Sequence, residues 1–138
     1  MEEFGPIEKE IVDKAFTFPL GIPGYPDARR FVFSQTPDEH PFARMLCLEK
    51  PDLVFAVIDA FYLKPDYVVD IDDTQLEVVG SPGPLDCLIF FILKIEGGKP
   101  FRVKANLRAP LLLNKEKRLG RQIVMADESL SDQAVFEF

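Results

Sequence analysis

Apolar and polar residues alternate along much of this chain in short runs, and glycine or proline separates one run from the next. A period of two is typical of β-strands that bury one face. The pattern therefore predicts about eight short strands and few helices. The predicted strands cover residues 7–18, 29–34, 42–49, 53–59, 67–71, 87–95, 101–107 continued by 111–114, and 121–125.

Two runs are almost wholly apolar instead of alternating: LVFAVIDAFYL at residues 53–63 and CLIFFIL at residues 87–93. Such runs indicate strands that are buried on both faces, and the first is expected to end near Asp59. The second gives the strongest strand prediction of the chain. It is far shorter than the roughly 18 residues that a membrane helix needs, so we expect a cytoplasmic protein.

Clusters of proline and glycine predict the connections between strands. They place a shaped loop at residues 19–27, turns at 35–41 and 115–120, a loop at 81–86 and a tight hairpin turn at 96–99. Residues 72–80 favour one or two helical turns, with Asp72 or Asp73 as N-cap and Gly80 at the end. Residues 127–138 read as an acidic C-terminal tail that is helical in part.

These elements predict an all-β protein, since no helical pattern lies between the strands and βαβ units are excluded. We expect a compact antiparallel β-barrel-like single domain over residues 1–138, with short Gly/Pro-rich connections and at most two short helical turns. In the hairpin that ends the predicted sheet, alternation turns Val103, Ala105 and Leu107 inward, together with Ile123 and Met125 of the return strand. Lys115, Lys117 and Arg118 are expected at a solvated tip.

Charge is divided unevenly along the chain. The formal net charge is −7, yet residues 99–121 contain eight Lys or Arg and one acidic residue, Glu116. The remainder of the chain therefore carries −14. A surface of that sign repels nucleic acid and suits a basic protein partner.

The basic hairpin leaves two other functions open. It suits a small RNA-binding β-barrel, although no aromatic residue for base stacking lies between Arg102 and Met125. It also suits a charged sheet edge that resists aggregation. An accessory subunit of an enzyme is a further alternative.

Catalytic and metal-binding motifs are missing from the sequence. His40 is the sole histidine and lies in a polar turn, while Cys47 and Cys87 are forty residues apart without a CxxC pair. The acidic run 70–77 fails the EF-hand pattern, because Gln75 stands where the calcium loop needs glycine. We therefore expect no enzyme activity, no cofactor and no metal.

Three segments resemble the FliW family of bacterial flagellar assembly factors. ANLRAPLLLNKEKRLGRQIVM at residues 105–125 is similar to the most distinctive motif of that family, and FPLGIPGYPDARRFVF at residues 18–33 to a second. Residues 41–67 are similar to a third, looser one. The matching residues that we expect to be structural are Gly21, Pro23, Gly24, Asn106, Pro110, Asn114, Gly120 and Gln122, with unusual backbone angles at Gly21, Gly24 and Gly120.

The resemblance implies a β-barrel-like fold and a function without catalysis. Proteins of this family bind flagellin, and in many bacteria also CsrA, an mRNA-binding translational repressor, and the two partners compete. The implied partners are therefore flagellin and CsrA, with no direct contact to nucleic acid or membrane, and the free protein is expected to be a monomer.

A partner-binding surface is predicted where acidic and aromatic residues follow one another. Its acidic members are Asp66, Asp70, Asp72, Asp73 and Glu77, which suit a basic RNA-binding partner. Its aromatic members are Phe61, Tyr62 and Tyr67, which are candidate anchors. Packing in the core is the alternative for these three aromatic residues.

Overall fold

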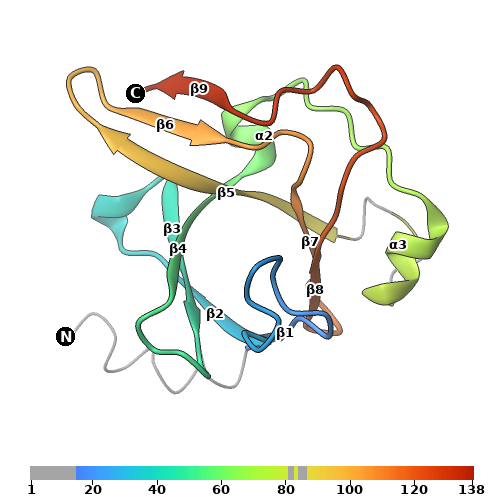
Figure 1. Cartoon of the computed structure of the whole chain (residues 1–138). Helices are drawn as coiled ribbons and strands as arrows, with labels where there is room; N and C mark the ends of the chain where they lie inside the picture. Colours follow the sequence, from blue (N-terminus) through green and yellow to red (C-terminus); the bar gives the residue numbers. More distant parts are fainter. Residues whose placement is uncertain (1–14, 81–82, 84–86) are drawn as a thin grey trace.

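The computed structural model describes residues 15–80, 83 and 87–138. Within them, one sheet holds nine strands in the order β4-β3-β2-β1-β8-β7-β5-β6-β9 (Figure 1). The strands are β1 (Phe16–Thr17), β2 (Arg30–Ser34), β3 (Phe42–Cys47), β4 (Val54–Asp59), β5 (Cys87–Gly97), β6 (Arg102–Ala105), β7 (Leu111–Asn114), β8 (Leu119–Gln122) and β9 (Ala134–Glu137). Three short helices accompany them, the 3-10 helix η1 (Pro37–Glu39), α2 (Ala60–Leu63) and α3 (Asp73–Val78).

The sheet returns on itself because β4 also pairs with β5, from Ala56↔Leu93 to Asp59↔Phe90. The strands from β4 round to β5 thus form a barrel-like ring, and β6 and β9 extend beyond it (Figure 1). The predicted all-β single domain is confirmed. One pairing departs from the antiparallel pattern, since β1 runs parallel to β8 at Thr17↔Leu119.

The interior of the ring is filled by side chains that alternate along its strands. Phe31 of β2, Met45 of β3 and Val57 of β4 are fully buried there, and Phe18 and Leu111 join them. Gly120 of β8 lies against this cluster. An added Cβ there would come within 2.6 Å of the Phe18 ring, so the position requires glycine for space, and the predicted unusual backbone angle at Gly120 is wrong.

A second core lies on the outer face of β4 and β5. Ile58, Ile89 and Phe91 point away from the ring interior and are covered by α2, α3 and the chain around them, including Leu76 and Val79. The strands of the two apolar runs are therefore buried on both faces over most of their length, although Val54 of β4 is 45% and Leu88 of β5 37% exposed.

The chain on either side of the β7–β8 hairpin joins this second core. Leu107, Ile123 and Met125 are buried as predicted, as are Val103 and Ala105, but they pack outside the ring and not within it. β6 and β7 form one interrupted strand along the same edge of β5, and Pro110 lies at the interruption as expected. The return strand begins at Leu119, two residues earlier than predicted.

Several local predictions agree with the structure, and two are wrong. The loop at 19–27, the hairpin turn after β5 and a short helix capped by Asp72 are all present. Residues 67–71 form no strand, because Tyr67 and Ile71 are buried against the outer core without a neighbouring strand to pair with. The C-terminal stretch is not helical but ends in β9, which pairs with β6. Of the predicted strand at 7–18 only residues 15–18 are described, and β1 lies within them; of the loop at 81–86 only Gly83 is described.

We predict that Leu107→Ala and Ile123→Ala each lower the free energy of unfolding by about 2–5 kcal/mol, because each leaves a cavity in the outer core. Val124→Ala is the matched control, since Val124 is 64% exposed and adjoins Ile123. Its expected effect is below about 0.5 kcal/mol. Urea unfolding of the three variants measures the difference, and equal small losses would show that the hairpin is not part of the core.

Candidate partner-binding surface

The chain from α2 to α3 is fastened to the outer core by Tyr67. Its hydroxyl donates a hydrogen bond to the carbonyl of Leu107, and its ring meets Phe91 edge-on at 4.9 Å between centroids. Burial raises the pKa of Tyr67 to about 12. Tyr67 is only 5% exposed, so it belongs to the core and is not an exposed anchor for a partner as predicted.

Asp72 is the N-cap residue of α3. Its carboxylate accepts hydrogen bonds from the Thr74 hydroxyl at 2.6 Å and from the Gln75 N–H at 2.9 Å. These bonds, the first of them above all, hold the pKa of Asp72 below its usual range. As an N-cap it satisfies backbone donors of the helix, so its loss would disturb α3 itself.

The C-terminal end of α3 is held by the basic hairpin. Asn114 is 5% exposed and donates from Nδ2 to the Val79 carbonyl at 2.8 Å, while its Oδ1 accepts from the N–H groups of Glu116 and Lys117. Gly80 closes the helix at φ +67 as predicted, and a Cβ there would lie 2.9 Å from Cδ of Lys117. The family-signature asparagine thus joins the helix to the hairpin.

The remaining predicted acidic residues lie on the surface of this fastened segment. Asp66, Asp70, Asp73 and Glu77 are exposed, and we call these four the acidic face. Asp66 pairs with Lys64 at 3.2 Å, and this hydrogen bond holds the pKa of Asp66 below its usual range. Asp66 and Asp70 also line a hollow of about 300 Å³, together with Asp127 and the apolar side chains of Val68 and Leu130.

The two other predicted aromatic anchors are exposed, but they lie elsewhere. Phe61 is 43% and Tyr62 53% exposed on α2, whose N-cap Asp59 accepts from their N–H groups at 2.8 and 3.2 Å. Tyr62 lines a different hollow, beside His40. The predicted surface is therefore divided between two places.

The basic charges of residues 99–121 are largely matched by neighbours. Five of these eight side chains face an acidic group or a ring: Arg102 with Glu137 at 3.0 Å, Lys104 with Glu96 at 3.6 Å, Arg108 with Asp127, Arg121 with Asp72, and Arg118 over Phe16 at 5.2 Å. Such pairing weakens the positive field that nucleic acid would need.

Arg118 differs from its predicted place at a solvated tip. It has a left-handed backbone at φ 56, its carbonyl accepts from the Thr17 N–H at 2.8 Å, and its side chain covers Phe16. Lys115 and Lys117 are exposed as predicted. Arg118 therefore joins the hairpin to β1.

The proline-rich loop at residues 19–27 is rigidly shaped. Ile22 and Tyr25 bond each other's backbone across Pro23 and Gly24, and Gly24 has φ +87 as a turn of this kind requires. Gly21, at φ +69, has no room for a side chain, because a Cβ would lie 2.7 Å from the Pro26 carbonyl oxygen. The predicted angles at Gly21 and Gly24 are confirmed.

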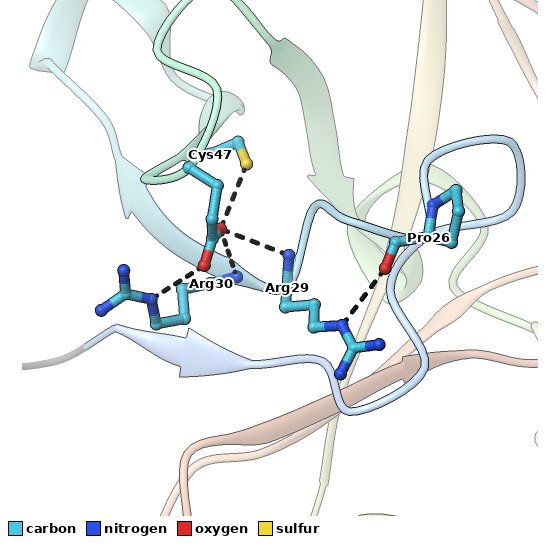
Figure 2. A network of polar contacts seen from close by, with 5 residues as sticks. Pro26, Arg29, Arg30 and Cys47 are labelled. Atoms are coloured by element: carbon cyan, nitrogen blue, oxygen red, sulfur yellow. Dashed lines mark hydrogen bonds and ion pairs between the residues drawn. The ribbon is translucent and has the colours of Figure 1, made fainter.

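Glu49 ties this loop to the end of β3 (Figure 2). Its carboxylate accepts from the N–H of Arg30 at 2.9 Å and of Arg29 at 3.3 Å, from Nε of Arg30 at 2.8 Å and from the Cys47 thiol at 3.5 Å. Arg29 in turn donates from Nε to the Pro26 carbonyl at 3.2 Å. Burial acts to raise the pKa of Glu49, but the hydrogen bonds from Arg30 outweigh it and lower the pKa to about 2.

Two further signature residues secure the interruption between β6 and β7. Asn106 accepts from the Arg108 N–H at 3.0 Å, and Gln122 donates from Nε2 to the Ala109 carbonyl at 3.0 Å. Pro110 is buried, and its carbonyl accepts from the Ile123 N–H. These contacts agree with the structural role expected of the three residues.

The sequence pattern did not reveal Glu49 or the hollow beside Tyr62. The Glu49 network depends on a contact over about twenty residues with Arg30, and nothing local in LEKPD signals it. The hollow depends on where β2 and β4 end and β3 begins. Neither feature has a period or motif by which it could be found.

A model of the FliW protein family matches residues 1–134. Among curated relatives, the flagellar assembly factor FliW of Thermotoga sp. (strain RQ2) is 34% identical over 122 residues, which cover 88% of this chain and 82% of the relative. The flagellar assembly factor FliW of Geobacillus thermodenitrificans (strain NG80-2) is 36% identical over 121 residues, which cover 87% of this chain and 79% of the relative. A crystal structure of the flagellar assembly factor FliW superposes with a TM-score of 0.79 at 32% identity, covering 88% of this chain and 84% of that one.

We predict that Glu49→Gln lowers thermal stability at neutral pH and flattens its dependence on pH in acid. Because the folded pKa is depressed from 4.5 to about 2, the ionised carboxylate stabilises the fold above pH 4.5. This stabilisation is lost as pH falls from 4.5 towards 2. Melting temperatures between pH 7 and 2 measure it, with Glu128→Gln on an exposed loop as the control. Parallel pH profiles for the wild type and Glu49→Gln would contradict the role given to the network.

Proposed function

The chain belongs to the FliW family of flagellar assembly factors, and from this premise we propose that it binds flagellin and sequesters the translational regulator CsrA. Acting in the cytoplasm, it couples flagellin synthesis to flagellin export. Flagellin that accumulates occupies the protein and leaves CsrA free to repress flagellin mRNA. When flagellin is exported, the protein is released and removes CsrA, so that translation resumes.

The observation that carries the proposal is the acidic face on a segment whose shape is fixed. Tyr67, Asp72 and Asn114 hold the segment at its beginning, at the start of α3 and at its end. The exposed carboxylates between these points are thus presented without a large ordering cost on binding. An RNA-binding repressor carries basic residues, so the charges of the two proteins are complementary.

The same charges support a role through proteins and not through RNA. Four of the eight basic residues at 99–121 face an acidic group and a fifth covers the Phe16 ring, while the remainder of the chain carries −14. Bringing RNA phosphates to this surface would set like charges against each other. We propose no catalytic step, and binding itself is the function.

The direct experiment mixes the purified chain with flagellin and with CsrA from its own bacterium. We predict a complex with each at micromolar concentration, and we predict that flagellin displaces CsrA. Calorimetry and size-exclusion chromatography measure both, and the chromatography also tests whether the free protein is a monomer. No complex with either protein, together with steeply salt-dependent binding of RNA, would favour the RNA-binding alternative.

We predict that Asp70→Lys, Asp73→Lys and Glu77→Lys combined weaken CsrA binding and slow association. Asp72 is kept, since its reversal would damage α3 and confuse the result. Because exposed charges are screened over about 8–10 Å, the difference from the wild type should shrink at high salt.

The control reverses two exposed acidic residues at the other end of β2–β4, Asp27→Lys and Asp52→Lys. Surface plasmon resonance across a salt series gives the association rates. Losses in proportion to the charge added, +6 in the triple variant and +4 in the control, would reduce the effect to net charge, and an unchanged rate in the triple variant would place the CsrA interface away from the acidic face.

A further inference from the structure

One end of the ring holds an open hollow with an apolar floor. It lies where β2 ends, β3 begins and β4 ends, and its volume is about 310 Å³. It is lined by Phe33, Ser34, Gln35, His40, Pro41, Ala43, Asp59, Tyr62 and Phe90. No residue of α3 or of the acidic face is among them.

The hollow lies where the pairing between β4 and β5 ends, and Asp59 and Phe90 of the last pair both line it. Asp59↔Phe90 is the last pair between the two strands, so Leu88 has no β4 residue opposite it. Phe90 is half-buried and lines the hollow, whereas Leu88, on the same side of β5, is 37% exposed and is not among the lining residues. Tyr62, at 53% exposed, adds a further apolar surface at the rim.

The walls of the hollow are held in place before any ligand arrives. The rings of Phe33 and Phe90 lie 5.8 Å apart, and His40 meets Tyr62 edge-on at 5.6 Å. Gln35 donates from Nε2 to the Phe42 carbonyl at 2.9 Å, which joins the end of β2 to the start of β3. A ligand that enters therefore removes apolar surface from water without first having to order these side chains.

The rim is acidic. Asp59 lines the hollow, and Asp38 and Glu39 of η1 line an adjoining hollow that shares His40 and Ala43 with it. The cation of this adjoining hollow, Arg44, already pairs with Glu39 at 3.0 Å. The charge left at the rim is negative, and it complements a positively charged ligand.

We propose that this hollow, which we call the mouth socket, receives one large apolar side chain from a protein partner whose flanking residues are Lys or Arg. Its volume lies at the lower limit of ligand pockets, about 300 Å³, which suits a single Phe or Leu side chain. The apolar floor supplies affinity, and the acidic rim selects basic neighbours. The mouth socket is a second binding site, separate from the acidic face.

The test is a titration of the ¹⁵N-labelled full chain with the peptide acetyl-Lys-Lys-Phe-Lys-Lys-amide. We expect NMR shift changes centred on the backbone amides of Phe33, His40 and Tyr62. A peptide with Glu in place of each Lys should bind at least about tenfold more weakly, and one with Ser in place of Phe should cause no such changes. Because the probe is synthetic, the result does not depend on whether flagellin or CsrA binds.

Two variants test the mouth socket, one by filling it and one by removing part of its rim. Ala43→Leu fills it and Tyr62→Ala removes part of its rim, and each should weaken the Phe peptide by more than about tenfold. Tyr25→Ala is the control, since Tyr25 is similarly exposed, at 42%, at the other end of β2–β4. If Ala43→Leu fails to fold, the binding of the Phe peptide to Tyr62→Ala still tests the proposal. Shifts elsewhere, equal binding of the acidic peptide, or full binding by Tyr62→Ala would overturn the proposal.

Discussion

The burial of β5 on both faces is the constraint on which the rest of the structure depends. Phe90 and Ile92 of this strand face the ring interior, while Ile89, Phe91 and Leu93 face the outer core. One edge of β5 pairs with β4 and closes the ring, and the other pairs with β7 and then β6. A strand in this position belongs to two cores at once, so the outer segment of residues 60–80 cannot separate from the ring without exposing β5 (Figure 1).

The basic hairpin completes the outer core that covers β5. Leu107 and Ile123 fill the outer core from one side, and the Leu107 carbonyl accepts from Tyr67 on the other. Asn114 then joins the hairpin to the end of α3. Half of the eight positive charges at residues 99–121 lie beside acidic groups, and the apolar residues of the hairpin account for its position better than its charges do. The segment that carries the proposed acidic face is thus supported by a basic hairpin, which need not touch a partner for the proposal to hold.

The sequence predicts the parts of this fold that repeat or that need one residue type. Alternation locates β2, β3 and β6, the run CLIFFIL locates β5, and Gly24 and Asp72 mark a turn and a cap. It misplaces a strand at residues 67–71, since Tyr67 alternates with its neighbours but is buried by side-chain packing alone. The sequence pattern also suggests that Tyr67 is an exposed anchor for a partner, whereas the structure buries it. The mouth socket is invisible, because it arises from where strands end relative to one another and not from any residue pattern.

The residues that identify the family and those that we propose to bind partners are under different physical constraints. Asn114 and Gly120 are buried, and a change at either leaves an unpaired carbonyl or a collision with Phe18, costs of about 1–3 kcal/mol. Asp70, Asp73 and Tyr62 are exposed, and most substitutions at such positions change stability by less than about 0.5 kcal/mol. Stability therefore fixes the first group whatever the partner is, and leaves the second group free to match the charge and shape of a particular partner. Membership of the family consequently establishes the scaffold, whereas the acidic face and the mouth socket must be tested on this chain itself.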